Sequence, residues 1–286
     1  QQTQSVYGSL EIGFKDAYYL SATLRTDWPS QLAGPKSTKS SFTYPSIGFS
    51  TVLSEIINLP KEISYLKVRG SYANVGNAFQ EFLANPRYQW NGTSWDTTYP
   101  YYPLVDLKPE RTNSYELGLT ARFLNDFSLD VTYYNAYSKD QTIRTPISAG
   151  SGYDNIYVQS GNVQNSGFEV SLGYDKKWNN FAWSSNFTLS TNKNKVKKLA
   201  RNVTNYVTGE QFSMTELDMG KLGDTRFYIK EGGTLGDIYS SADLVRDDKG
   251  RVYINENGEV QAVRDIKGVE NWTKLGSVLP KANLAW

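Results

Sequence analysis

The chain has 286 residues, and its 30 basic and 29 acidic residues give a formal net charge of +1. It contains no cysteine and no histidine. These absences exclude a thiolate or imidazole metal site, a cysteine nucleophile and a Ser-His-Asp triad, and the balanced charge gives no field that attracts nucleic acid. We therefore expect no enzyme, no cofactor and no metal centre.

Alternating apolar and polar residues predict β-strands from the start of the chain. Strands are expected at 5–14 and 18–25, joined by a tight turn at 15–16. A further strand resumes near 47–51, and another covers 66–72. Successive side chains of a strand point to opposite faces, so each of these segments has one apolar and one polar face. No run approaches the roughly 18 apolar residues that a membrane-spanning helix needs.

The clearest pattern is a hairpin that runs from residue 113 to residue 135. From 114 to 133, outside a break at 124–126, its odd positions are apolar or aromatic and its even positions are small, polar or charged, including Glu116 and Asp130. The hairpin therefore has one continuous apolar wall and one polar wall. A similar hairpin is expected over 168–189.

The lengths of the connections are asymmetric along the whole chain. Short connections fall at 15–16, 54–63, 124–126 and 176–180, and they alternate with long ones at 26–43, 74–106, 136–163 and 192–278. Outer-membrane barrels join their strands through short periplasmic turns and longer extracellular loops. The pattern predicts an all-β fold: a segment of about eight to nine strands from an antiparallel transmembrane β-barrel.

Three parts are expected from this pattern. Residues 1–191 supply the barrel strands with their turns and loops. Residues 192–278 form a long extracellular loop or a small β subdomain, because residues 251–254 alternate between two turn signals. Residues 279–286 begin the next strand. The sequence starts just before one strand and stops inside another, so we expect an internal piece of a longer barrel.

Several segments resemble one family. Residues 107–118, LKPERTNSYELG, are similar to a strand start in SusC/RagA-type TonB-dependent transporters, the outer-membrane nutrient importers of Bacteroidota. Further similar segments follow the order of that family, at 66–73, 129–135, 161–169, 233–239 and 275–281. The resemblance implies a full barrel of 22 strands around a plug, and this sequence has no counterpart of the plug domain.

The same resemblance implies a function and partners. The whole protein would import glycans, oligosaccharides or peptides with a SusD-like surface lipoprotein, and TonB would drive it through the plug region. It would lie in the cell outer membrane, among lipid and lipopolysaccharide, with no nucleic-acid partner. The alternative is a surface-exposed β-sandwich, an adhesin or carbohydrate-binding protein without transport.

Aromatic residues in two long loops are the candidate substrate-binding residues. Flat rings suit stacking on sugar faces or gripping a peptide, but they can equally pack a large loop against its neighbours. Both interpretations remain open for the whole set, which consists of Trp90, Trp95, Tyr99, Tyr101, Tyr102, Tyr153 and Tyr157.

Three other groups have simpler explanations. Asp243, Asp247 and Asp248 lie near Asn255 in a composition that suits calcium, but their spacing does not match an EF-hand and indicates turns. The carboxylates Glu116 and Glu169 belong to separate hairpins and are expected to face the barrel lumen. A basic run indicates a solvated face or a contact with anionic lipopolysaccharide, and it consists of Lys193, Lys195, Lys197 and Lys198.

Overall fold

The computed structural model describes residues 2–34, 37, 39–84, 88–97, 107–146, 150, 153, 155–204, 211–223, 225–240, 244–261 and 272–285. These residues form four antiparallel sheets and two short 3-10 turns, η1 (Ser30–Leu32) and η2 (Leu53–Glu55). Within the described ranges, no helix has the length and apolar character required to cross a membrane.

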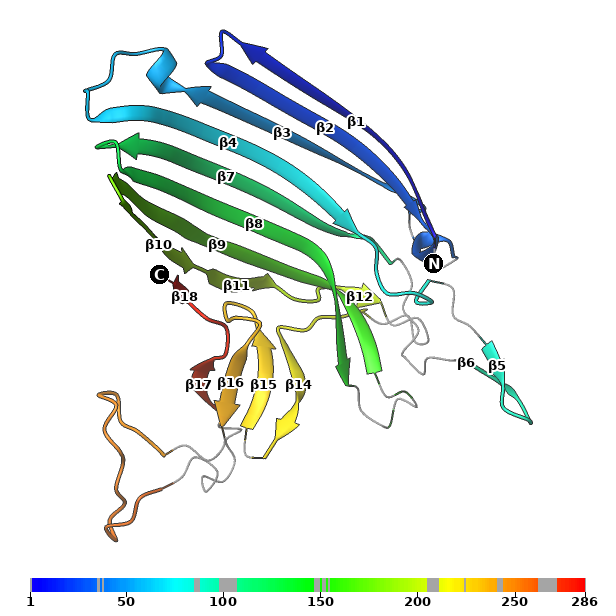
Figure 1. Ribbon diagram of the computed structural model, residues 1–286. Coiled ribbons are helices and arrows are strands. Elements are labelled where there is room, and N and C mark those ends of the chain that lie inside the picture. The colour runs from blue at the N-terminus through cyan, green and yellow to red at the C-terminus, as the bar shows by residue number, and fades with distance from the viewer. Residues whose placement is uncertain are drawn as a thin grey trace.

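The largest sheet is a curved wall whose strands follow one another in chain order (Figure 1). Its successive strands are β1 (Thr3–Phe14), β2 (Tyr18–Pro29), β3 (Phe42–Val52), β4 (Ile63–Asn77), β7 (Glu110–Phe123), β8 (Phe127–Pro146), β9 (Asn155–Trp178), β10 (Phe181–Thr191) and β18 (Ala282–Ala285). A tenth strand, β11 (Lys193–Lys198), pairs with the outer part of β9. This arrangement confirms the predicted antiparallel barrel segment.

The register places all apolar rows on one side of the wall. One such row crosses six neighbouring strands through Val68, Leu119, Val131, Val170, Leu189 and Leu284. The adjacent row, on the opposite side, is polar and consists of Lys67, Thr120, Asp130, Ser171 and Thr188. Leu10 and Leu117 on the apolar side are 54% and 64% exposed, far more than a core in water would allow. This side of the wall therefore faces lipid.

Aromatic pairs mark both ends of the apolar side. Near the short turns, the rings of Phe123 and Phe127 stack with centroids 5.5 Å apart. Toward the long loops, Tyr115 packs against Tyr72 at 5.0 Å. Eight residue steps separate Phe123 from Tyr115, or about 26 Å along a strand at about 3.3 Å per residue. Two aromatic belts at this spacing are typical of the two membrane interfaces.

The sequence places a long loop at 136–163, and this boundary is wrong. Strands β8 and β9 continue through most of it and pair as far as Pro146 with Asn155. The register shifts between Ser138 and Gln141. Beyond the hydrocarbon neither face of a strand has to be apolar, so these outer extensions lack the alternation on which the prediction depended.

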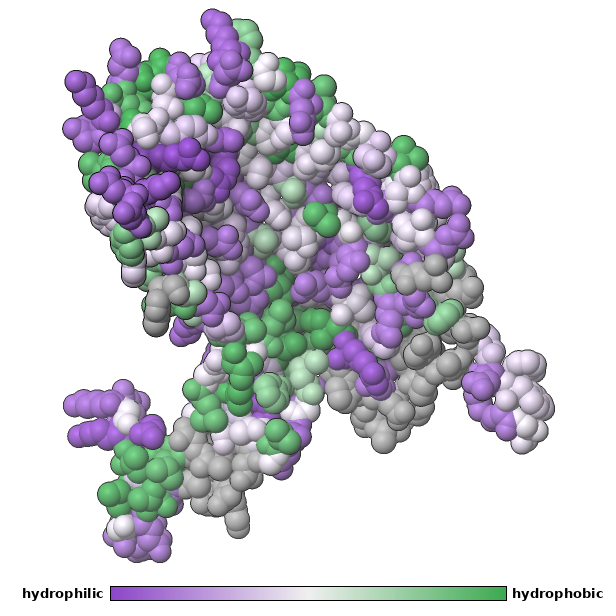
Figure 2. Space-filling model, viewed as in Figure 1, coloured by the Kyte–Doolittle hydropathy of each residue, from purple (hydrophilic) through white to green (hydrophobic). Residues whose placement is uncertain are grey.

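Smaller sheets and packed loops lie at the long-loop end of the wall. A two-stranded hairpin consists of β5 (Tyr88–Trp90) and β6 (Trp95–Thr97), and another of β12 (Val203–Thr204) and β13 (Gln211–Phe212). A four-stranded sheet, called here the small sheet, consists of β14 (Glu216–Leu222), β15 (Thr225–Lys230), β16 (Asp237–Ser240) and β17 (Thr273–Ser277). Figure 2 shows hydrophobic side chains gathered where the small sheet meets the large one.

Candidate functional site

The polar side of the wall carries an ion pair that spans three strands. Arg69 on β4 donates two hydrogen bonds to Asp130 on β8, at 2.8 and 3.0 Å, and a third to Thr120 on β7, at 2.9 Å. The guanidinium lies over Gly118, where a Cβ atom would approach the Arg69 Cζ to 2.5 Å. The glycine of the SYELG segment therefore makes room for a charged group that ties neighbouring strands together.

Two predicted lumenal carboxylates share a hollow on this polar side. Glu116 and Glu169 both line a space of about 250 Å³, together with Thr132 and Tyr134. The registers place Glu116 opposite Tyr134 and Glu169 opposite Thr132, on the same side as Asp130. The hollow gives the inner surface a local concentration of carboxylate groups.

The β5–β6 hairpin presents two of the predicted aromatic residues to solvent. Trp90 and Trp95 face each other across the strands with ring centroids 5.6 Å apart, and they are 52% and 67% exposed. Asn91 holds the tip, because its Oδ1 accepts hydrogen bonds of 2.8 Å from the backbone N–H groups of Thr93 and Ser94. The short turn fixes the distance between two broad apolar surfaces.

Tyr157 lies in a different environment. It belongs to the outer part of β9 and is 8% exposed. Its hydroxyl donates a hydrogen bond of 3.1 Å to Gln80 Oε1. It belongs to a cluster of buried residues that also contains Leu32, Phe42, Phe79, Leu83, Ala84 and Leu107. Trp90 and Trp95 are not members of this cluster, so the structure separates Tyr157 from the hairpin.

Four other aromatic residues complete the predicted set. Tyr153 is half-buried. Tyr99, Tyr101 and Tyr102 lie outside the described residues. The structure thus brings together Trp90 and Trp95 alone among the described members of the set.

A second apolar core attaches the small sheet to the wall. It consists of Val163 on β9, Val196 and Leu199 on and after β11, Leu217 on β14 and Ile229 on β15. Hydrogen bonds of 2.9 and 2.8 Å join the backbone of Val196 to the 232–233 turn. The small sheet is therefore fixed to the outer end of the barrel wall.

Two carboxylates, the buried Asp237 and the half-buried Glu231, stabilise the turn between β15 and β16. Asp237, 1% exposed, accepts hydrogen bonds from the Thr234 N–H and hydroxyl at 3.0 and 2.5 Å and from the Lys274 ammonium. Burial raises the pKa of Asp237, but the bonds from Lys274 and Thr234 outweigh that effect and leave the pKa below its usual value. The Leu199 N–H and then Arg201 lower the pKa of Glu231. Asp237 lies in the 233–239 segment that resembles the transporter family, but no local sequence pattern predicts its role in holding this turn.

The acidic turns near residue 250 form a small meander. Isolated bridges pair Arg246 with Val252 and Ile254 with Val260. Asp247 accepts from the backbone of Lys249 and from the Arg251 guanidinium, so its carboxylate is engaged within the turn. No group of three metal-ligating side chains occurs among the described residues, and Asp243 lies outside them.

Comparison with known proteins defines the class. A family model described as "TonB dependent receptor-like, beta-barrel" matches residues 1–275. The chain therefore belongs to the TonB-dependent receptor family, as a segment of its outer-membrane β-barrel, and this family is one of transporters rather than enzymes. Family and curved sheet together favour the barrel over the β-sandwich that the sequence left open.

Individual proteins refine the similarity. TonB-dependent receptor P26 of Formosa agariphila is 30% identical over 211 residues, which cover 69% of this chain and 21% of that protein. Receptor P39 of the same organism is 26% identical over 251 residues, which cover 84% of this chain and 22% of that protein. The chain thus spans about a fifth of the length of these relatives.

A solved structure gives the same result for the fold. The RagAB peptide transporter aligns with 99% of this chain and 30% of its own chain, with a TM-score of 0.75 and 19% identity. At this identity the likeness establishes the fold. It agrees with the SusC/RagA-type resemblance of residues 107–118.

Proposed function

We propose that this chain forms part of the wall and outer mouth of an active importer in the outer membrane. The importer takes up oligosaccharides or peptides through TonB and works with a SusD-like surface lipoprotein. The main support is the alignment of 99% of the chain with the RagAB peptide transporter at a TM-score of 0.75, together with the family match. In this scheme the lipid-facing wall anchors the protein, and the loops at its outer end select the cargo.

The exposed Trp90–Trp95 hairpin is the proposed substrate grip. Two rings with centroids 5.6 Å apart, each more than half exposed, offer a firm apolar surface to a sugar face or an apolar peptide side chain. Tyr157 lies apart from this hairpin, and its proposed part is to stabilise the buried cluster to which it belongs. The roles of Tyr99, Tyr101, Tyr102 and Tyr153 stay a prediction.

The meander at residues 245–261 is the proposed docking element for the lipoprotein. It exposes Tyr253, Ile254 and Val260 at 47%, 58% and 52%, an apolar set on a solvated element. Exposed apolar residues that gather on one element often mark a contact with another protein. Obligate docking uses an interface of about 2,000 Å² or more, and long outer loops of this kind supply such area.

Deletion of the meander tests this function. The backbone N–H of Val245 donates to the carbonyl of Gln261 at 2.9 Å, so the two ends already meet and a short glycine linker can replace what lies between. In the full-length receptor we expect co-purification of the lipoprotein and growth on the cognate nutrient both to fall, while the barrel still folds in the membrane.

A finer pair of variants separates docking from general damage. Ile254→Ser with Val260→Ser removes the apolar surface, whereas Lys249→Ser alters the tip of the same meander and serves as control. Loss of the lipoprotein in the first variant alone supports docking. Wild-type co-purification and growth in both would show that the meander only shields the barrel mouth.

A further inference from the structure

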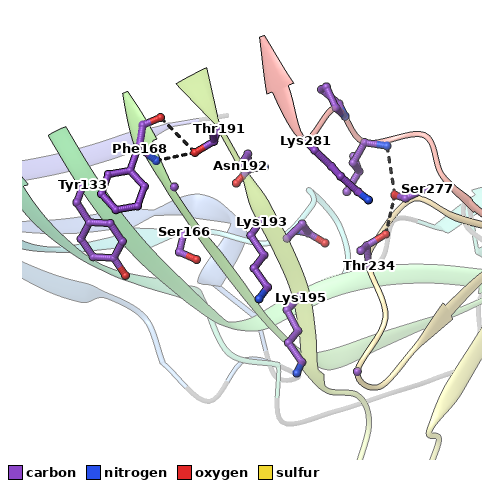
Figure 3. Close-up of a pocket in the computed structure, with 15 residues that line it drawn as sticks. Tyr133, Ser166, Phe168, Thr191, Asn192, Lys193, Lys195, Thr234, Ser277 and Lys281 are labelled. Carbon is purple, nitrogen blue, oxygen red and sulfur yellow. Dashed lines mark hydrogen bonds between the residues drawn. The ribbon is translucent and has the colours of Figure 1, made fainter. Parts of the chain in front are cut away.

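A cavity of about 610 Å³ opens on the apolar side of the wall, where β10 ends beside residues 166–168 in the middle of β9. Tyr133 and Phe168, whose rings pack with centroids 5.1 Å apart, form one side of it. The small sheet forms another side through Thr234, in the turn before β16, and Ser277, at the end of β17. The hydroxyls of these two residues lie 2.8 Å apart. Figure 3 shows these groups, from four separate segments, around one space.

The cavity results from a break in strand pairing at Thr191. The Thr191 hydroxyl takes the place of a backbone partner and accepts a hydrogen bond of 2.9 Å from the Phe168 N–H. The Thr191 carbonyl oxygen lies over Gly167, so close that a Cβ atom on this glycine would be only 1.9 Å from it. The same oxygen accepts a hydrogen bond of 3.0 Å from the Tyr134 hydroxyl. After this point β11 follows β9 while β10 pairs with β18, so the backbone itself fixes the gap.

Three lysines line the cavity. Lys193 and Lys195 extend from β11, and Lys281 extends from the segment just before β18 (Figure 3). All three are exposed, and no aspartate or glutamate occurs among the described residues that line the space. By contrast, Lys230 and Lys274 on the small sheet each contact a carboxylate. The cavity therefore concentrates positive charge that the described part of the chain leaves unneutralised.

The position of these lysines fits the headgroup region of the membrane. Tyr133 and Phe168 lie on the lipid-facing side, in register with the apolar rows of the wall, at the end where the long loops emerge. Aromatic residues at such a position mark the interface between hydrocarbon and headgroups. Lys193 and Lys195 follow directly outside this belt, where long basic side chains reach the phosphate level of a lipid.

We propose that this cavity binds lipopolysaccharide, with Lys193, Lys195 and Lys281 holding a phosphate of its lipid A headgroup. The acyl chains lie below against Phe168 and the apolar wall, and the hydroxyls of Thr234 and Ser277 face the sugar. Lysine binds phosphate as a point charge, and basic pockets next to a lipid-facing surface suit anionic headgroups. This proposal depends only on the outer-membrane location of the chain, and not on the substrate or the lipoprotein.

The geometry selects among the lysines of the basic run. Lys197 and Lys198 are also exposed and lie on the same strand, but they do not line the cavity. If general positive charge were sufficient, all four lysines of the run would contribute alike. The proposal instead assigns the contact to Lys193 and Lys195 together with Lys281, which is 86 residues further along the sequence than Lys195.

The test measures binding of fluorescent deep-rough lipopolysaccharide to the delipidated full-length receptor in detergent. The triple variant Lys193→Gln, Lys195→Gln, Lys281→Gln should bind on the order of 100-fold more weakly, since each lysine near an anionic headgroup contributes about fivefold. The triple arginine variant of the same positions should bind as wild type does, which separates loss of charge from loss of fold.

A matched variant removes three charges elsewhere. Lys177→Gln, Lys197→Gln, Lys198→Gln has the same net charge as the first variant and should keep wild-type affinity. Lipopolysaccharide from which the lipid A phosphates have been removed should bind weakly to the wild type, and the first variant should not weaken it further.

Three outcomes would overturn the proposal. In the first, the glutamine triple variant and the wild type bind lipopolysaccharide equally well. In the second, vesicles of phosphatidylglycerol show the same dependence on the three lysines, which would make the site one for phospholipid. In the third, the variant keeps its lipopolysaccharide and loses the lipoprotein, which would make the cavity a protein contact.

Discussion

The wall and the small sheet are both antiparallel β structure, yet they bury opposite sets of side chains. On the wall, Leu10 and Leu117 point outward and are 54% and 64% exposed. On the small sheet, Leu217 and Ile229 point into a core and are 3% and 6% exposed. The same residue type is stable in both places only if the surroundings differ. Hydrocarbon completes the wall, whereas the small sheet completes its own core against β9 and β11.

The charged groups of the two regions follow the same division. Asp130 on the wall reaches Arg69 across the polar side, and its side chain remains 41% exposed. Asp237 in the small sheet has a side chain with no exposed area and accepts bonds from backbone, hydroxyl and ammonium groups. A charge in the wall can thus rely on water in the lumen, while a charge in the small sheet depends on protein donors.

The largest expected effect comes from placing a charge on the lipid-facing side. Leu119 lies midway between the two aromatic belts, in one row with Val68 and Val131. Leu119→Arg in the full-length barrel should lower the free energy of unfolding by about 2–4 kcal/mol, because arginine is costly near the bilayer midplane. Urea-dependent folding into lipid vesicles measures this change.

The neighbouring Glu116→Gln is the matched control. Glu116 lies on the polar side and lines an open hollow, so its substitution should cost far less. Equal losses from the two substitutions would mean that the wall does not separate lipid from lumen, and the contrast between the two regions would lose its basis.

A smaller effect is expected when the buried carboxylate of the small sheet loses its charge. Asp237→Asn should lower the local stability of β16 and β17 by about 1–3 kcal/mol, since the amide keeps only one of the two acceptor oxygens and lacks the charge that pairs with Lys274. Hydrogen exchange of these strands in the full-length receptor should increase, while exchange in the wall stays unchanged. Asp247→Asn, in an exposed turn, is the control and should change neither.

The same carboxylate predicts a dependence on pH. The folded-state pKa of Asp237 lies below that of the unfolded chain, which is about 3.9. Its contribution is therefore fully present above that unfolded value and is lost as the pH falls through the lower folded-state pKa. Protection of β16 and β17 should decrease in this acid range in the wild type and should show no such step in Asp237→Asn.

How far the sequence predicted the fold differs between these regions. The wall was predictable because lipid on one side and water on the other impose a strict alternation, as at 113–135. Outside the hydrocarbon this constraint ends, and the sequence misassigned the β8 and β9 extensions as a loop. Their pairing depends on contacts between distant residues, such as Pro146 with Asn155, that no local period records.

The candidate site was predictable only by residue type. Aromatic composition pointed to seven residues, but it could not separate the exposed pair Trp90 and Trp95 from the buried Tyr157. That difference arises from tertiary packing, because Tyr157 shares a buried cluster with Phe42 and Leu107, which come from distant parts of the chain. The lysine cavity was similarly hidden, since Lys281 joins Lys193 only where the chain returns to the wall.

The smallest expected effect compares two exposed tryptophans, one from each environment. Trp95 is 67% exposed in the outer hairpin, and Trp183 is 54% exposed on the lipid-facing side of β10. If the hairpin grips cargo, Trp90→Ala and Trp95→Ala should each weaken substrate binding by about 0.5–1.5 kcal/mol, the usual worth of an aromatic contact. Calorimetric titration of the full-length receptor with oligosaccharides and with peptides measures this change. Trp183→Ala should leave binding unchanged, because its ring faces lipid. Unaltered affinity in the Trp90→Ala, Trp95→Ala double variant, or an equal loss in Trp183→Ala, would remove the hairpin from the binding site and leave its rings as packing for the loop.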